Sequence, residues 1–268
     1  MSPQRLAFFD VDGTLTTDIT LFRFLRFYLA ARGHGPQVYE QRRQRLKAMT
    51  AAGVPREATN RAYFANFRDA DAATVTDLAR VWFERELDQG GFLNPSAVDA
   101  LHRHRSRGET VVLVSGSFPA VLLPLAEHLG VTDLLATTPE ILHGRYTGEL
   151  LRPPMIGAAK ADAARLAASV HGADLADCTA YGDHLSDLPI LNAVGTPVAV
   201  AGDPRLDQHA RAHHWTVLPG APEPPELPLG ECAAPEGGER RALAVRRTVP
   251  TVRTVRAIPA VEAQEAIG

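Results

Sequence analysis

The chain has 268 residues, of which 45% are hydrophobic and 22% are charged, a composition typical of a globular protein with a sizeable core. Its net charge of −3, from 28 basic and 31 acidic side chains, gives no overall electrostatic basis for binding nucleic acid or an anionic membrane. Cys178 and Cys232 are its two cysteines, and we find no export signal, so we expect no disulfide framework and a cytoplasmic location.

The first third of the chain is predicted to be one strand followed by helices. The strand covers residues 5–9 and ends at Asp10 and Asp12. Helices are predicted at 20–32, 37–52, 56–67 and 72–88, separated by glycine, proline and aspartate. The longest apolar run, residues 21–31, is too short to span a bilayer and contains two arginines, so we expect no membrane span.

From about residue 95, short apolar strands alternate with helices, which predicts βαβ units and a mainly parallel sheet. We therefore expect an α/β protein with a three-layer, Rossmann-like core built from residues 1–15 and 95–218, and an inserted all-helical cap at residues 16–94. The predicted strands are 110–114, 134–138, 178–182, 197–201 and 215–218, a hairpin is predicted at 140–150, and the predicted helices are 96–108, 119–130, 157–170, 185–194 and 204–214.

The composition changes in the tail, residues 219–268. Its first part is rich in proline, glycine and glutamate, and its second part, from residue 240 onward, carries six arginines. We expect the first part to be flexible. The second part is either a disordered basic arm or a short strand that docks on the core.

Residues able to do chemistry follow several of the predicted strands. In a parallel α/β sheet, ligands bind at the carboxyl ends of the strands, so these residues should meet at one edge. Asp187 follows Asp183 by about one helical turn, and Lys160 lies on a helix between the later strands. The residues collected in this way are Asp10, Asp12, Gly13, Thr14, Ser115, Gly116, Lys160, Gly182, Asp183 and Asp187.

Asp10 and Asp12 require a neighbouring positive charge. Alternation along a strand would point both carboxylates the same way, where they repel each other unless a cation, a proton or a set of donors holds them. Three carboxylates with further oxygen ligands suit Mg²⁺. The ammonium of Lys160 would offset more of the charge, and Lys47 is the one other lysine in a chain that otherwise uses arginine.

These residues predict phosphoryl chemistry. Asp10 could attack phosphorus and form an aspartyl-phosphate, while Asp12 would protonate the leaving oxygen and then activate water. Thr14, Ser115 and neighbouring backbone N–H groups would hold the phosphate oxygens. Lys160 would stabilise the charge on the transferring group.

Four segments resemble, in this order, the motifs of the haloacid dehalogenase-like (HAD) hydrolase superfamily. They are FFDVDGTL at 8–15, VLVSGS at 112–117, GAAK at 157–160 and YGDHLSD at 181–187. The insertion after the first motif resembles a C1-type cap. The segments GRYTGEL and PRLDQHARAHHWTVL are similar to the phosphoserine-phosphatase-like branch, subfamily IB, and the resemblance covers about residues 5–218.

The resemblance implies a Mg²⁺-dependent phosphatase that hydrolyses a small-molecule phosphate monoester, with no nucleic-acid partner and with the oligomeric state left open. It implies that Asp10 is the nucleophile, Asp12 is the acid and base, and Ser115, Gly116 and Lys160 contact phosphate. Mg²⁺ would be held by Asp10, the main-chain carbonyl of Asp12, and Asp183, with Asp187 as an outer or water-mediated contact.

The predicted cap leaves the substrate open. Phosphoserine phosphatases carry a glutamate shortly after the first motif, whereas this chain offers only Asp18, so we do not expect phosphoserine as the substrate. One alternative is a phosphotransferase or diphosphate-cleaving enzyme acting on an isoprenoid or lipid phosphate. A second is a non-catalytic binding module that uses the basic tail. The first alternative is motivated by aromatic side chains of helix 20–32, although such side chains more often face a core; they are Phe22, Phe24, Phe27 and Tyr28.

Overall fold

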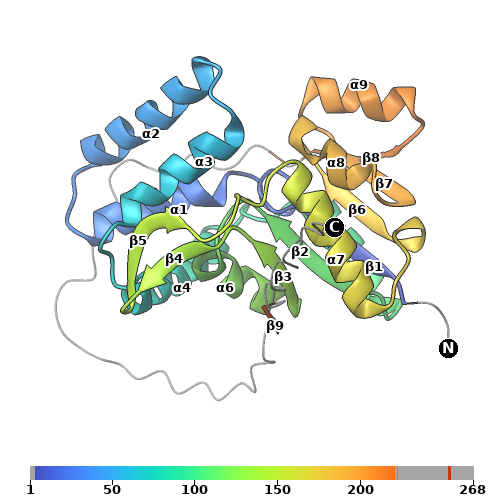
Figure 1. The fold of residues 1–268 in the computed structure, drawn as a ribbon, viewed down its shortest axis with the longest axis horizontal. Coiled ribbons are helices and arrows are strands. Elements are labelled where there is room, and N and C mark those ends of the chain that lie inside the picture. The colour runs from blue at the N-terminus through green and yellow to red at the C-terminus, as the bar shows by residue number, and fades with distance from the viewer. Residues whose placement is uncertain (1–3, 221, 223–252, 255–268) are drawn as a thin grey trace, which may run out of the picture.

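The computed structural model describes residues 4–220, 222 and 253–254. A seven-stranded sheet lies at its centre in the order β8-β7-β6-β1-β2-β3-β9, and every neighbouring pair is parallel (Figure 1). The α/β fold with a mainly parallel sheet is therefore confirmed. The strands are β1 (Leu6–Phe9), β2 (Thr110–Ser115), β3 (Asp133–Ala136), β6 (Thr179–Gly182), β7 (Thr196–Val200), β8 (Thr216–Leu218) and β9 (Arg253–Thr254).

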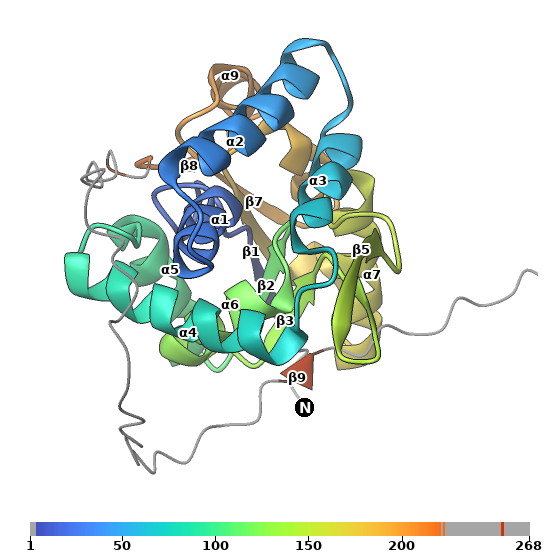
Figure 2. The ribbon, with the colours of Figure 1, turned by 90° about the vertical axis from the view of Figure 1, so that its left-hand side faces the viewer.

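Two hydrophobic clusters, one on each face of the sheet, give the core its three layers. Neighbouring residues of β1 belong to different clusters, because side chains alternate along a strand: Phe9 lies in one and Phe8 in the other. Helices α5 (Pro95–Ser106) and α6 (Pro119–Leu129) contribute to the first cluster. Helices α7 (Ala158–His171), α8 (Leu188–Leu191) and α9 (Pro204–Ala212) contribute to the second. Figure 2 shows α5 and α7 on opposite sides of the sheet.

The central position of β1 brings several strand ends together. Phe9, its last residue, pairs with Leu113 of β2 on one side and with Tyr181 of β6 on the other. The residues that follow β1, β2 and β6 therefore come out at the same edge of the sheet, as expected for a parallel arrangement.

The segment between β1 and β2 is helical, as predicted. It contains α1 (Thr20–Ala31), α2 (Pro36–Ala51), α3 (Arg56–Phe64), a 3₁₀ turn at Ala65–Phe67, and α4 (Ala72–Gln89). Asp71 caps the start of α4, because its side chain accepts a hydrogen bond from the Thr74 amide at 2.8 Å. Helices α1 and α4 share the first hydrophobic cluster with α5, α6 and the sheet. The division into a core and a separate cap at residues 16–94 stays a prediction.

The aromatic side chains of α1 belong mainly to this core. Phe24 is fully buried, and Phe27 and Tyr28 are 8% and 7% exposed, whereas Phe22 is partly buried. Phe24 packs against Phe118, the residue just before α6, with ring centroids 6.1 Å apart. The helix therefore uses most of its aromatic surface to attach to the rest of the molecule.

Helix α1 also carries a buried arginine, which is paired. The Arg23 guanidinium donates to both carboxylate oxygens of Glu86 on α4, at 3.0 and 2.5 Å. Trp82 donates its ring N–H to the same carboxylate at 2.7 Å. This arrangement satisfies a charge that would otherwise be costly to bury, and it ties α1 to α4.

The predicted hairpin is formed by β4 (Pro139–Leu142) and β5 (Arg145–Leu150), which pair antiparallel. It lies beside the helical segment, since the Asp69 amide donates to the Tyr146 carbonyl at 2.8 Å and the Tyr146 amide to the Ala70 carbonyl at 3.0 Å. The predicted helix at 185–194 is shorter than expected: a 3₁₀ turn at Leu185–Asp187 precedes the four-residue helix α8.

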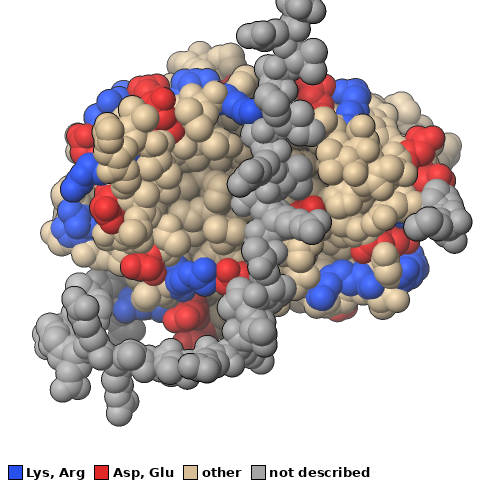
Figure 3. Space-filling model, turned by 60° about the horizontal axis from the view of Figure 1, so that its bottom comes forward, with Lys and Arg blue, Asp and Glu red and all other residues tan. Residues whose placement is uncertain are grey.

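Little of the tail lies within the described residues. Its strand β9 pairs parallel with β3 through Arg253 and Thr254, which agrees with the docking-strand alternative for these two residues. The other predictions for residues 219–268, and Cys232, lie largely outside the described residues, whereas Cys178 is a buried free thiol. Acidic and basic side chains are interspersed on the face seen in Figure 3. Within the described part of the chain, no helix has the length and apolar character required to cross a membrane.

Candidate active site

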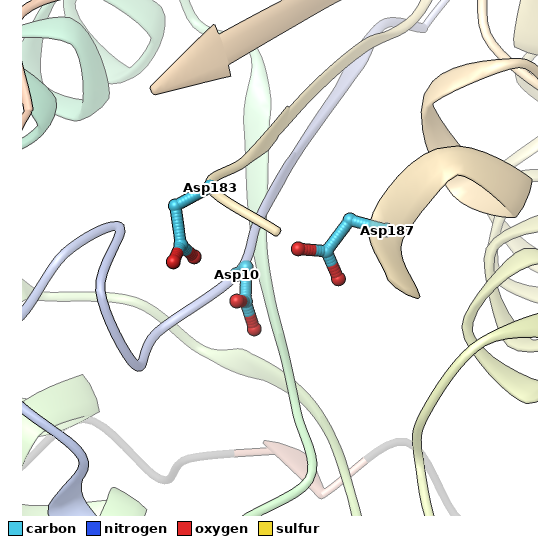
Figure 4. Close-up of side chains that lie close together, drawn as sticks. All are labelled: Asp10, Asp183 and Asp187. Carbon is cyan, nitrogen blue, oxygen red and sulfur yellow. The ribbon is translucent and has the colours of Figure 1, made fainter. Parts of the chain in front are cut away.

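Three carboxylates meet at the carboxyl edge of the sheet. Asp10 follows β1, Asp183 follows β6, and Asp187 ends the 3₁₀ turn that comes next. Each offers one oxygen atom, and the three atoms lie within 4.8 Å of one another (Figure 4). The structure thus brings together three of the four residues predicted as metal ligands. Asp187, which was predicted as an outer or water-mediated contact, is 1% exposed and belongs to the same cluster as Asp10 and Asp183.

Lys160 joins this cluster from the first turn of α7. Its ammonium donates to Asp10 Oδ1 at 2.6 Å and to Asp187 Oδ1 at 2.7 Å. Burial by itself would lower the pKa of Lys160, but the two carboxylates outweigh burial and raise it. The lysine is therefore a permanent positive charge that holds Asp10 and Asp187 together.

The cluster carries more negative charge than one ammonium can neutralise. Burial raises the pKa of Asp10 well above its usual range, and the nearby Asp187 and Asp183 raise it further against the opposing effect of Lys160. Burial and Asp187 likewise raise the pKa of Asp183 to about 6, although the Thr14 hydroxyl donates to it at 2.9 Å. The raised pKa values of Asp10 and Asp183 show that the cluster lacks positive charge. A hard divalent cation would supply this charge, and such cations prefer oxygen ligands.

Asp12 lies apart from these three carboxylates. Its Oδ1 accepts a hydrogen bond from the Thr20 amide, the first residue of α1, at 2.8 Å. The expectation that strand alternation aligns Asp12 with Asp10 is wrong in its premise, because β1 ends at Phe9, before both residues. Burial raises the pKa of Asp12, against the effects of Thr20 and the positive charges nearby. A carboxyl group that keeps its proton more readily is suited to proton transfer.

Two glycines allow the chain to approach the carboxylates closely. Gly13 has φ +85°, and a Cβ there would clash with Asp183 Oδ2 and lie 2.7 Å from Asp183 Cγ. A Cβ on Gly182 would lie 2.7 Å from the Cβ of Asp187. Both positions therefore require glycine, the first for its backbone conformation as well as for space.

The turn after β2 carries two predicted phosphate-binding residues. Ser115, the last residue of β2, is fully buried, and its Oγ accepts from the Ser117 amide at 2.9 Å. The Gly116 carbonyl accepts from the side-chain amide of Asn60 at 3.0 Å. Because β2 lies beside β1, this turn comes out next to Asp10 at the edge of the sheet.

Helix α3 supplies contacts that the sequence did not predict. Arg56 donates to Ser186 Oγ at 3.2 Å, in the turn that ends at Asp187, and Asn60 reaches Gly116. These two residues are four apart and so lie on one face of the helix. That spacing is visible in the sequence, but it does not indicate which distant turns the face would contact.

A pocket of about 530 Å³ opens beside the carboxylates. It lies between the turn after β1 and the turns after β6 and β7, and Asp183 is among its lining residues. The lining residues are Gly13, Asp183, His184, Ala201, Gly202 and Asp203.

The comparisons with known proteins agree with the fold and the motif order. The family model for haloacid dehalogenase-like hydrolases matches residues 7–192. The chain belongs to this family. A similar solved structure is the crystal structure of a protein of unknown function from Bordetella pertussis Tohama I. The two structures align with a TM-score of 0.73 and 27% sequence identity, and the match covers 81% of this chain and 99% of that one.

Several curated relatives carry phosphatase names, among them two phosphoserine phosphatases. Phosphoserine phosphatase SerB1 of Mycobacterium tuberculosis is 37% identical over 114 residues, which are 42% of this chain and 37% of that protein. The phosphoserine phosphatase of Streptomyces coelicolor is 31% identical over 207 residues, which are 77% of this chain and 46% of that protein. The chain thus spans less than half the length of these relatives.

Proposed function

We propose that the protein is a Mg²⁺-dependent phosphatase that hydrolyses a small-molecule phosphate monoester through an aspartyl-phosphate on Asp10. The observation that carries the proposal is that three carboxylates share one cluster while the fourth has a different hydrogen-bond partner. Asp10 shares a buried cluster with Lys160, Asp183 and Asp187, whereas Asp12 is held separately by the start of α1. Membership of the HAD hydrolases and the names of the relatives support the same chemistry.

The cation would be held by Asp10, Asp183 and Asp187, together with the main-chain carbonyl of Asp12. When bound, Mg²⁺ supplies positive charge that offsets the carboxylates and the phosphate oxygens. Lys160 neutralises part of the same charge and holds Asp10 in place. Thr14, Ser115 and Gly116 would orient the remaining phosphate oxygens, partly through backbone N–H groups.

The first step is attack by an oxygen of Asp10 on phosphorus. The bond from phosphorus to the alcohol oxygen breaks, and the Asp12 carboxyl gives its proton to that oxygen, so the alcohol leaves neutral. In the second step, Asp12 takes a proton from a water molecule, which attacks the phosphorus of the aspartyl-phosphate. Phosphate is released, Asp10 is a carboxylate again, and Asp12 is protonated.

The burial pattern favours a small polar substrate over a lipid. The aromatic residues of α1 that motivated an isoprenoid or lipid phosphate are mainly part of the core. Asp18, the acidic residue after the first motif, is paired with Arg23 at 3.5 Å.

The scarcity of cysteine, with Cys178 buried and free, supports a reducing compartment, and we propose the cytoplasm.

The test is phosphate release from a panel of sugar, polyol, amino-acid, nucleotide and prenyl phosphates, with and without Mg²⁺. Asp10→Asn should abolish metal-dependent turnover. Asp162→Asn is the matched control, because Asp162 is an exposed residue of α7 paired with Arg165, and it should retain full activity. A folded, Mg²⁺-binding protein that releases no phosphate from any ester would contradict the proposal and would favour the binding-module alternative.

A further inference from the structure

A carboxylate from a neighbouring element holds the loop at residues 183–187, which carries two of the three clustered aspartates. Asp203 Oδ2 accepts a hydrogen bond from the Leu185 amide at 3.0 Å. Leu185 lies midway between Asp183 and Asp187, whereas Asp203 lies between β7 and α9. Asp203 is not a member of the carboxylate cluster, so its contact with this loop requires an explanation of its own.

The neighbouring amides of the loop have acceptors inside the loop. The His184 amide donates to Asp187 Oδ2 at 3.2 Å, and the Asp187 amide donates to the His184 carbonyl at 2.8 Å. The Ser186 amide donates to His184 Nδ1 at 3.0 Å. These three bonds determine the shape of the loop. Among the four amide bonds made by residues 184–187, the bond from Leu185 to Asp203 is the one that ties the loop to another element.

The bond lies where the loop borders open space. Asp183, His184 and Asp203 all line the pocket of about 530 Å³. Residues 183–186 are half-buried. A loop beside a pocket gains little from packing on that side, so its hydrogen bonds have a larger share in fixing its position.

Asp203 is suited to this role because each of its oxygens has a separate partner. Its Oδ1 accepts from the Arg205 amide at 2.8 Å and caps α9. Burial by itself would raise the pKa of Asp203, but the amides of Leu185 and Arg205 outweigh burial and lower it. Hydrogen bonds to an ionised acceptor are stronger than those between neutral groups. One oxygen therefore anchors the carboxylate on α9 while the other holds the loop.

We propose that Asp203 is a positioning residue for the metal site. Its carboxylate holds the loop at residues 183–187 against the start of α9, so that Asp183 and Asp187 keep their oxygens close to that of Asp10. The inference rests on the proposed function, because it takes these aspartates as the ligands of Mg²⁺.

Asp203→Ser separates the two hydrogen bonds of Asp203. Serine is also a good helix cap and can accept from the Arg205 amide, but its single oxygen leaves the Leu185 amide without its acceptor. Calorimetric titration should show Mg²⁺ binding weakened about tenfold, the effect of one lost hydrogen bond to a charged group.

The matched control is Asp174→Ala. Asp174 also accepts from a backbone amide, that of Ala176 at 2.9 Å, and it caps the 3₁₀ turn at Leu175–Asp177. This turn precedes β6, whereas the loop that carries the aspartates follows β6. The control variant should bind Mg²⁺ as tightly as the natural protein.

Amide hydrogen exchange of the metal-free protein measures the order of the loop without turnover. The bond from the Asp187 amide to the His184 carbonyl is not touched by Asp203→Ser. If Asp203 holds the loop, the Asp187 amide should nevertheless exchange about tenfold faster in this variant. Its exchange rate should be unchanged in Asp174→Ala.

Four outcomes separate the inference from the proposed function. Unchanged Mg²⁺ affinity in Asp203→Ser, or an equal loss in Asp174→Ala, would overturn the inference and leave the proposed function standing. Weaker Mg²⁺ binding without faster exchange at Asp187 would also overturn the inference, because loss of the negative charge would then explain the result. Both effects in a protein that hydrolyses no phosphate ester would overturn the proposed function alone.

Discussion

Replacing Lys160 by methionine removes the positive charge from the carboxylate cluster and keeps a side chain of similar length. The ammonium lies 2.6 Å from Asp10 and 2.7 Å from Asp187. With an effective dielectric constant of about 20, each attraction amounts to roughly 6 kcal/mol before the cost of burial is subtracted. Removing one partner from a buried ion pair typically costs about 3–5 kcal/mol, because the remaining charge stays buried.

The free energy of unfolding that Lys160→Met removes should depend on pH. Burial already raises the pKa of Asp10, and the loss of the lysine raises it further. A carboxyl whose folded-state pKa lies above its unfolded value stabilises the fold at low pH, and this contribution is lost as the pH rises through the folded pKa. We therefore expect the variant to lose about 3–5 kcal/mol at pH 8 and clearly less at pH 5, where Asp10 can take up a proton.

Urea unfolding of the metal-free protein at both pH values measures this effect. Lys47→Met is the matched control, because Lys47 is the other lysine and is exposed on α2. It should change the free energy of unfolding by no more than about 0.5 kcal/mol. An equal loss for Lys160→Met at pH 5 and pH 8, or an equal loss for the two lysine variants, would refute the electrostatic reasoning.

Three further predictions concern the metal site and the core. Gly13→Ala should weaken Mg²⁺ binding by roughly tenfold or more and destabilise the fold by about 1–2 kcal/mol, because a Cβ there clashes with Asp183 and the left-handed backbone is strained; calorimetric titration and urea unfolding measure both effects. Mg²⁺ affinity should fall by up to about tenfold per pH unit below about 6, since protons compete for Asp183, and a flat titration between pH 5 and 8 would contradict this. Phe118→Ala should cost about 3–5 kcal/mol in urea unfolding, because Phe118 is fully buried among aromatic rings, whereas the partly buried Phe22→Ala should cost less.

The strand ends were the most predictable part of the site. Asp10 and Asp183 follow short apolar runs, and parallel strands place the residues after them at a common edge. Asp187 was harder to place, because an acidic residue early in a helical turn is equally typical of a solvated surface. Its burial depends on Lys160, 27 residues away in the chain, which forms an ion pair with it.

The positions of the helices before β2 were predictable, but their contacts were not. Periodicity predicted where α1 and α3 lie and favoured a core position for the aromatic rings of α1, but it did not reveal which rings they would meet or that Asn60 contacts the turn after β2. An amphipathic helix has an apolar face whether that face meets a core, a partner or a substrate.

The sequence by itself therefore determined the α/β architecture, the family motifs and the chemical types gathered at the sheet edge, because backbone periodicity and strand polarity are local properties. The tertiary structure alone decided which of these residues share one charge cluster, which aromatic groups are core, and which carboxylate accepts from the Leu185 amide. These outcomes depend on distances between segments far apart in the chain, such as Asp10 to Lys160, and those distances are fixed only when the helices pack against the sheet.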